Sequence, residues 1–202
     1  MPLLDADGKP LIGKVSGDAE GLTYKDGLVF VSFERKHRIL AYNLERCGVA
    51  ARGVFFTGSP AKTLKTKLGA NGGAESLDVN SKGHIRAGYE TVIDGASPLV
   101  SFADTGQALA EIEFAPTEAD FKLVGADDGY LLFRAYDAER GNRNIIRGPS
   151  IEFELAPPLN IDNFEGLAVE NIKAGSTRLY LVSDDNYSAR QRTLLYVFDI
   201  SD

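Results

Sequence analysis

The chain has 202 residues, of which 44% are hydrophobic and 25% charged, close to the average for soluble globular proteins. This composition excludes wholesale disorder, and one domain over residues 1–202 is expected because all-β domains reach this length. With 22 basic against 29 acidic residues the formal charge is -7, which argues against binding to nucleic acid or to an anionic membrane. Cys47 is the only cysteine, so an intrachain disulfide is excluded.

The chain begins with a predicted hairpin-like fragment at residues 2–13, which turns at Asp7-Gly8 and has no basic and apolar regions of a signal peptide. Ser59–Gly69 has a Ser cap, an early Pro and a final Gly, which predicts a short surface helix. Apolar, β-rich runs recur elsewhere in pairs, which predicts hairpins at residues 28–33 with 38–44, 130–133 with 144–147, and 179–183 with 193–198.

A repeated motif, x-x-Glu-(Gly/Ser)-Leu, precedes the hairpins. It occurs as Glu20-Gly21-Leu22, Glu75-Ser76-Leu77 and Glu165-Gly166-Leu167, and residues 119–123, around Asp120, hold a degenerate copy. A period of roughly 40 to 50 residues with four strands per unit is typical of propeller blades. We therefore predict an all-β fold, a β-propeller of four-stranded antiparallel blades in which Leu22, Leu77 and Leu167 are buried at equivalent positions. The blades are expected at about residues 16-57, 72-116, 119-155 and 162-201.

The fragment at residues 2–13 is interpreted as the outer part of a preceding blade. With the four predicted blades, three arrangements are open. The blades close as a small ring, they belong to a larger ring whose upstream blades are missing, or a second copy covers the gap as a homo-oligomer. In the second and third arrangements, the blade at 16-57 is expected to show an apolar face that is exposed or covered by another copy.

The motifs resemble those of the phytase-like family described as having esterase-like activity. Asp162–Val169, Leu181–Ser188 and Gln191–Leu195 are similar to that family's C-terminal signature, and Asp18–Leu22 and Asn71–Leu77 to its earlier blades. The resemblance implies a β-propeller hydrolase of a small-molecule ester or phosphoester, in a periplasmic or secreted location. It also implies a truncated chain, because members usually carry further blade sequence and an export signal upstream.

The sequence offers few residues for nucleophilic catalysis. It contains no Gly-x-Ser-x-Gly turn, and His37 and His84 lie in polar connections where exposed turn residues are expected rather than catalytic bases. Two histidines and one cysteine also give few of the ligands that zinc favours.

Carboxylates are the main candidates for functional side chains in this sequence. Glu20, Glu75 and Glu165 recur at the start of the innermost strands, so in a closed ring they converge on one end of the channel, where oxygen ligands suit calcium. The alternative is that each Glu accepts backbone N–H bonds and holds a turn of its own blade. Asp184 and Asp185 follow a strand end and either wrap a cation or hold a turn.

Arginines recur after the second strand or in the second hairpin turn of several blades. Together with Asn186 they are candidates for binding the substrate's phosphate or carboxylate, and the alternative is pairing with acids between blades. These candidates are Arg35, Arg38, Arg134 and Arg192. The sequence thus predicts a hydrolase with calcium at the channel mouth, and the alternative is a noncatalytic propeller that binds a ligand or a protein.

Overall fold

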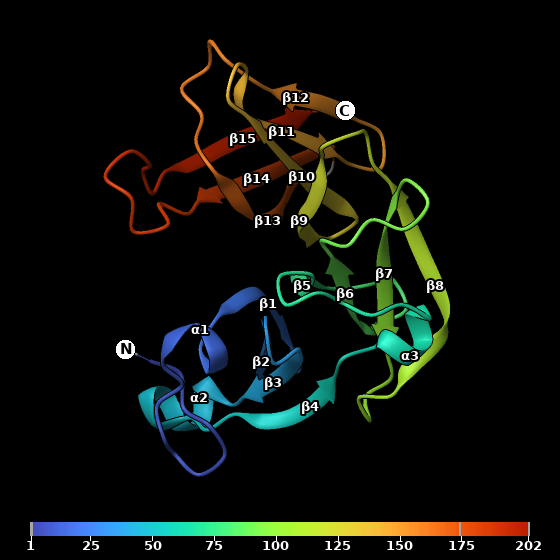
Figure 1. The fold of residues 1–202 in the computed structure, drawn as a ribbon, viewed down its shortest axis with the longest axis vertical. Coiled ribbons are helices and arrows are strands. Elements are labelled where there is room, and N and C mark those ends of the chain that lie inside the picture. Colours follow the sequence, from blue (N-terminus) through green and yellow to red (C-terminus); the bar gives the residue numbers. More distant parts are fainter. Residues whose placement is uncertain (1, 174, 202) are drawn as a thin grey trace. The chain divides into compact units, whose positions relative to one another are not determined.

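The computed structural model describes residues 2–173 and 175–201. The strands are β1 Ala19–Lys25, β2 Leu28–Phe33, β3 Arg38–Tyr42, β4 Val54–Gly58, β5 Ala74–Val79, β6 Ile85–Tyr89, β7 Ala96–Phe102, β8 Ala108–Pro116, β9 Lys122–Asp127, β10 Tyr130–Asp137, β11 Gly141–Arg147, β12 Glu152–Leu155, β13 Phe164–Lys173, β14 Ser176–Ser183 and β15 Leu195–Ser201. The helices are α1 Gly13–Ser16, α2 Leu44–Cys47, the 3-10 turn η1 Gly48–Ala50 and α3 Ala61–Leu64 (Figure 1).

These strands form four antiparallel sheets, ordered β1-β2-β3-β4, β5-β6-β7-β8, β12-β11-β10-β9 and β13-β14-β15. The chain divides into two compact units, residues 1–116 and 117–202, and each unit pairs two sheets. The predicted all-β, β-propeller class with four blades is confirmed. The last blade differs from the prediction, because three strands rather than four form its sheet in the described residues.

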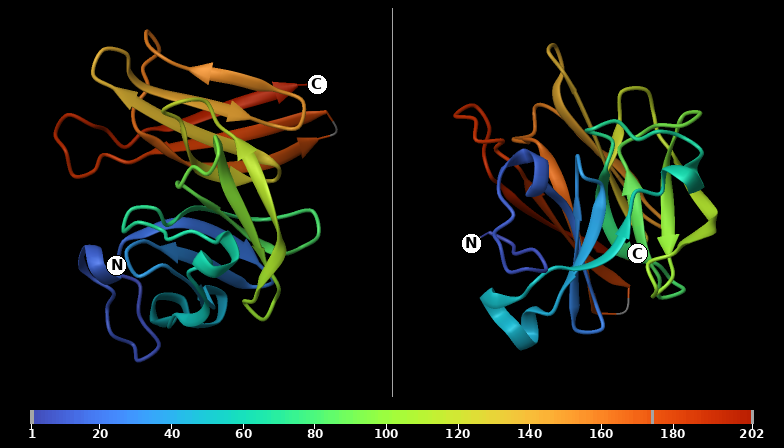
Figure 2. Two further views of the ribbon diagram at one scale, coloured as in Figure 1. Left: turned by 45° about the vertical axis from the view of Figure 1, so that its right-hand side comes forward. Right: turned by 60° about the horizontal axis from the view of Figure 1, so that its bottom comes forward.

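In the first unit, the two sheets pack through a core that Phe30, Ile39, Leu77, Ile85 and Val100 share (Figure 2). The innermost strands β1 and β5 approach closely at Gly21. A Cβ there would lie 2.9 Å from the Ser76 carbonyl carbon and 3.0 Å from the Leu77 nitrogen. At Gly21 the small residue of the motif is therefore a packing requirement, because β5 leaves no room for a side chain.

The second unit is built in the same way, around a core that includes Leu132, Ile146, Phe164 and Leu181. At Gly125 in β9, a Cβ would meet the Leu167 Cβ at 3.1 Å and the Glu165 carbonyl at 3.3 Å. The close approach of inner strands thus recurs between β9 and β13.

The three motif leucines differ in burial, so the prediction that they are equivalent is wrong. Leu77 is 3% exposed and Leu167 is half-buried, whereas Leu22 is 65% exposed. Leu77 and Leu167 pack toward the sheet that precedes theirs in the same unit. No sheet precedes β1 within the first unit, so Leu22 has no equivalent surface there.

The N-terminal fragment covers part of the first sheet. Leu4 bridges to Pro10 across the predicted turn and also to Arg52, while Leu3 and Leu11 pack against the cluster formed by Val31, Phe33, Leu40, Tyr42 and Ala51. The expectation that this face is open or covered by another copy is therefore wrong for β2 and β3. The β1 side chains Leu22 and Tyr24 stay exposed.

The predicted helix at residues 59–69 forms but is shorter than expected. It ends at Lys65, which takes a left-handed φ of 53° and whose backbone N–H donates to the Ala61 and Lys62 carbonyls. These bonds cap the helix before the predicted end at Gly69. No helix in the described residues combines the length and apolar character needed to cross a membrane.

Gly21→Ala is expected to lower the free energy of unfolding by about 1–3 kcal/mol, because the new methyl group meets β5 backbone atoms that cannot move alone. Gly166→Ala is the matched control. Its Cβ meets mainly the Val182 Cγ1, the end of a side chain that is 44% exposed and can rotate away. Urea unfolding of both variants checks this, and equal losses would contradict the close approach of β1 and β5.

Candidate functional site

The three motif glutamates lie in β-bulges. The register of β1 with β2 shifts between Ala19 and Leu22, that of β5 with β6 between Ala74 and Ser76, and that of β13 with β14 between Phe164 and Gly166. A bulge leaves the extra residue unpaired and redirects its side chain. The residues so placed are Glu20, Glu75 and Glu165.

Each of these sheets carries a second acid where its second strand ends. These acids are Glu34, Glu90 and Asp184. The backbone N–H of each donates to the carbonyl of the residue two positions before the bulged Glu, at 2.9, 3.4 and 3.0 Å. The accepting residues are Asp18, Gly73 and Asn163. Sequence analysis missed Glu34 and Glu90, whose signal is an acid directly after the second apolar strand.

In the third sheet, different residues occupy the two positions at which the other sheets have the bulged Glu and the second acid. Its bulge, between Leu123 and Gly125, contains Val124, and Arg134 follows Phe133 where the other sheets have an acid. Val124-Gly125-Ala126 is therefore the degenerate copy of the motif. The predicted copy at residues 119–123 places Phe121 at the Glu position and is three residues too early. This sheet contributes a cation where its three relatives contribute carboxylates.

The acids of the first two sheets converge. One carboxylate oxygen from each of Asp18, Glu20 and Glu34 lies within 4.8 Å of the others, and the same holds for Glu34, Glu75 and Glu90. Glu34 belongs to both groups and is only 7% exposed. We call these five residues the acid cluster.

The crowding changes the protonation of the acid cluster. Burial and, in smaller measure, the negative charges of Glu20, Glu90 and Glu34 together raise the pKa of Glu75 to about 9. Glu75 also shares a hydrogen bond with Glu34. At neutral pH, Glu75 is therefore protonated and donates to the Glu34 carboxylate.

Gly73 lets the acid cluster close around Glu34. Its N–H donates to Glu34 Oε1 at 3.4 Å, and a Cβ at Gly73 would lie 3.0 Å from Glu34 Cγ and 3.1 Å from His37 Nδ1. His37 is half-buried rather than exposed, since its Nε2 donates to the Gly69 carbonyl at 2.8 Å. Its Nδ1 is buried with no hydrogen-bond partner in the described part of the chain.

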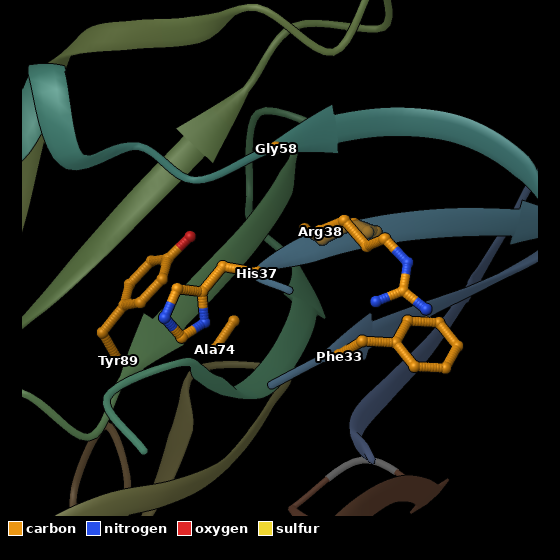
Figure 3. Close-up of a pocket in the computed structure, with 7 residues that line it drawn as sticks. Phe33, His37, Arg38, Gly58, Ala74 and Tyr89 are labelled. Atoms are coloured by element: carbon orange, nitrogen blue, oxygen red, sulfur yellow. The ribbon is translucent and has the colours of Figure 1, made fainter. Parts of the chain in front are cut away.

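A small cavity of about 10 Å³ lies beside the acid cluster (Figure 3). Three of its lining residues directly precede cluster acids along the chain: Phe33, Ala74 and Tyr89. The His37 ring lines it as well, and its volume suits a single water molecule. Burial strongly raises the pKa of Tyr89, so its hydroxyl stays protonated.

In the second unit, Glu165 is held by an arginine. Arg134 Nη1 donates both to Asn163 Oδ1, at 2.5 Å, and to Glu165 Oε1, and Asn163 Nδ2 donates to the same Glu165 oxygen at 2.9 Å. The ion pair joins the third and fourth sheets. Among the described residues, the groups of acids whose oxygens converge lie in the first unit.

The acidic run after β14 holds a turn. Asp184 Oδ1 accepts the Asn186 N–H at 3.0 Å, and Asp185 Oδ1 accepts the Tyr187 N–H at 2.9 Å. Thr193 donates to the second Asp185 oxygen at 3.1 Å. Asn186 and Tyr187 both have positive φ, 48° and 53°, which these bonds support. A cation role of Asp184 and Asp185 remains a prediction.

Arg192 and Arg38 have partners within their own units. Arg192 Nε lies 3.3 Å from Asp162 Oδ2. Arg38 donates to the Ser16 and Lys36 carbonyls and stacks on the Phe33 ring, and burial lowers its pKa.

Arg35 differs from these in its surroundings. Its Nε lies 3.1 Å from Asp18 Oδ2, so this guanidinium borders the acid cluster.

The comparisons with known proteins agree with the fold. The family described as "Phytase-like: Esterase-like activity of phytase" matches residues 1–148, and this match ends before the C-terminal segment at 162–195. No curated protein matches the chain.

Two solved structures illustrate the likeness. The chain is similar to the exo-β-1,3-galactanase of Phanerochaete chrysosporium, with a TM-score of 0.56 and 11% identity, over 100% of this chain and 50% of that chain. It is also similar to a GH43 β-1,3-galactosidase solved with galactodeoxynojirimycin, with a TM-score of 0.51 and 8% identity, over 92% of this chain and 74% of that chain. At these identities the likeness shows the fold, and the chain spans half the length of the galactanase.

The stability of the protein is expected to fall as the pH rises from 4.5, the ordinary pKa of Glu75, to its folded-state value of about 9. In this interval the folded protein holds a proton on Glu75 that the unfolded chain has released. Because the folded state binds more protons, each unit of pH lowers the free energy of unfolding by on the order of 1 kcal/mol.

Glu75→Gln, which imitates the protonated carboxyl, should flatten this slope in urea unfolding at about pH 5, 7 and 9. Glu111→Gln is the control, since the Glu111 side chain is 83% exposed and lies outside the acid cluster. Equal slopes for the wild type and Glu75→Gln would show that Glu75 does not hold the proton.

Proposed function

The chain belongs to the phytase-like family, and we propose that it is a hydrolase of a small-molecule ester or phosphoester whose reaction depends on calcium held by the acid cluster. The observation that carries this proposal is the convergence of two carboxylate triads on the buried Glu34. Family membership supports a periplasmic or secreted location, which we propose as well.

The donor set fits a hard divalent cation. Calcium takes six to eight oxygen ligands with flexible geometry, and the acid cluster supplies five carboxylates. The proton on Glu75 relieves part of the repulsion among the carboxylates, and a bound cation would relieve more of it. This repulsion supports the assignment of a cation to the acid cluster. Residues Asp18, Glu20, Glu34, Glu75 and Glu90 would hold the ion, which when bound offsets the charge of a phosphate or polarises an ester carbonyl.

The protein's own groups would position the substrate and the ion. Arg35 borders the acid cluster through Asp18, so its guanidinium can bind a substrate phosphate or carboxylate without leaving the site. Among the predicted substrate-binding residues, the side chains of Arg38, Arg134 and Arg192 bond to neighbouring groups of the protein, and Asn186 lies in the turn that Asp184 holds. We therefore assign the substrate contact to Arg35. Glu75 carries a proton at neutral pH in the ion-free site and would release it to solvent when calcium binds, so that Glu75 would act as a ligand of the ion.

Calcium is expected to raise the melting temperature of the wild type and to be required for hydrolysis of aryl esters or aryl phosphomonoesters. Glu34→Gln should raise the calcium concentration needed for half-maximal stabilisation by roughly tenfold or more, because it removes a charge shared by both triads. Glu111→Gln serves again as the control and should behave like the wild type.

The two readouts separate the alternatives. Calcium binding that depends on Glu34 but gives no turnover on either substrate class would leave a noncatalytic, ligand-binding propeller. Turnover that survives chelation and Glu34→Gln would place the active site elsewhere. No calcium effect on melting would contradict the cation site itself.

A further inference from the structure

The first unit contains a second hollow, far larger than the one beside the acid cluster. It has a volume of about 360 Å³ and lies at the opposite end of the β1–β2 hairpin, where β1 ends and β2 begins. This volume falls in the lower part of the range of small-molecule sites. We call it the hairpin pocket.

The walls of the hairpin pocket are apolar and largely aromatic. They consist of Leu28, Phe30, Ala41, Val54, Phe55, Phe56 and Ile85. Phe30 and Phe56 stand edge to face with centroids 5.0 Å apart, which makes this part of the wall rigid. Val54 and Phe55 are 65% and 66% exposed, so the apolar surface continues to the opening.

The mouth of the hairpin pocket is polar and carries net negative charge. Lys25 bonds to Asp104 at 2.6 Å and to Asp26 at 3.4 Å, and Thr105 stands beside them. The Lys25 side chain is 18% exposed, whereas those of Asp104 and Asp26 are 80% and 82% exposed. An anion would have to displace two carboxylates from Lys25, while a cation finds both of them accessible.

The fold builds this mouth from two sheets. Gly106, with φ 79°, lets the β7–β8 turn lie directly against β4, since a Cβ there would be 1.9 Å from the Phe56 carbonyl oxygen. This turn carries Asp104 to the end of β1, where it meets Lys25. Asp26 takes φ 51° in the β1–β2 turn, so both carboxylates are placed by constrained turns.

From this combination we infer that the hairpin pocket binds a small aromatic or aliphatic molecule that carries a protonated amine. The apolar part lies among the phenylalanines, and the ammonium group lies at the mouth between Asp26 and Asp104. This site is separate from the acid cluster and does not depend on the proposed hydrolase activity.

Three probes of equal length test the inference: 3-phenylpropylamine, 3-phenylpropanol and 3-phenylpropanoate. Each is titrated into the full chain while amide chemical shifts are followed by nuclear magnetic resonance. We expect saturable shifts around residues 25–30 and 104–106, with the amine bound roughly fivefold tighter than the alcohol and the acid weakest. Alcohol or acid binding as tightly as the amine would overturn the cationic class of ligand.

Ala41→Leu adds three carbon atoms to the wall of the hairpin pocket and so narrows it without removing any contact. It should strongly weaken saturable binding of all three probes while the protein stays folded. Shifts unaffected by this variant, or no saturable shift with any probe in the wild type, would overturn the site. Thermal melts of Ala41→Leu confirm that a loss of binding does not come from unfolding.

The double variant Asp26→Asn with Asp104→Asn tests the mouth. Asn tolerates the left-handed conformation of Asp26, and removing both carboxylates exposes the Lys25 ammonium. The preference should then reverse, with the acid bound tighter than the amine. Asp94→Asn is the matched control, because Asp94 has φ 49° and also precedes a glycine but lies outside the pocket, and it should leave the order unchanged. An unchanged order in the double variant would contradict the proposed role of the carboxylates.

Discussion

The close approach of neighbouring inner strands is the constraint on which the rest of the first unit depends. At Gly21, β1 and β5 leave no room for a Cβ, and the Ser32 hydroxyl joins them by accepting the Gly21 N–H at 2.8 Å and donating to the Ala74 carbonyl at 2.7 Å. This buried hydroxyl ties three strands together with no charged group. The bulges beside this contact then decide where Glu20 and Glu75 point.

The acid cluster follows from this backbone arrangement, and its assembly opposes folding. Glu34 is buried among carboxylates, and a lone buried charge of this kind is strongly unfavourable. The protein offsets part of this repulsion with the proton on Glu75 and with Arg35, which pairs with Asp18. A site that must be neutralised by protons or cations is poised to exchange one for the other. This exchange underlies the proposed calcium dependence.

The sequence pattern located the inner-strand glutamates because the motif is local: Glu, a small residue and Leu stand in a row. Glu34 and Glu90 escaped prediction because their partners lie 14 and 15 residues earlier, and only the strand register brings each pair together. Leu22 was misjudged for a related reason. The alternation of β1 shows which face it occupies, but burial depends on whether another sheet covers that face.

The third sheet differs from the other three in the charge of its repeated positions. The third sheet holds Val124 and Arg134 at the two positions where the other three sheets hold acids. Arg134 then neutralises Glu165 of the fourth sheet, with Asn163 orienting both groups. One unit therefore balances its carboxylate with a built-in cation, whereas the other gathers five carboxylates around a shared proton. The same blade design thus yields a structural ion pair in one unit and a candidate metal centre in the other, and the difference rests on which side chain occupies the equivalent position along or directly after the second strand.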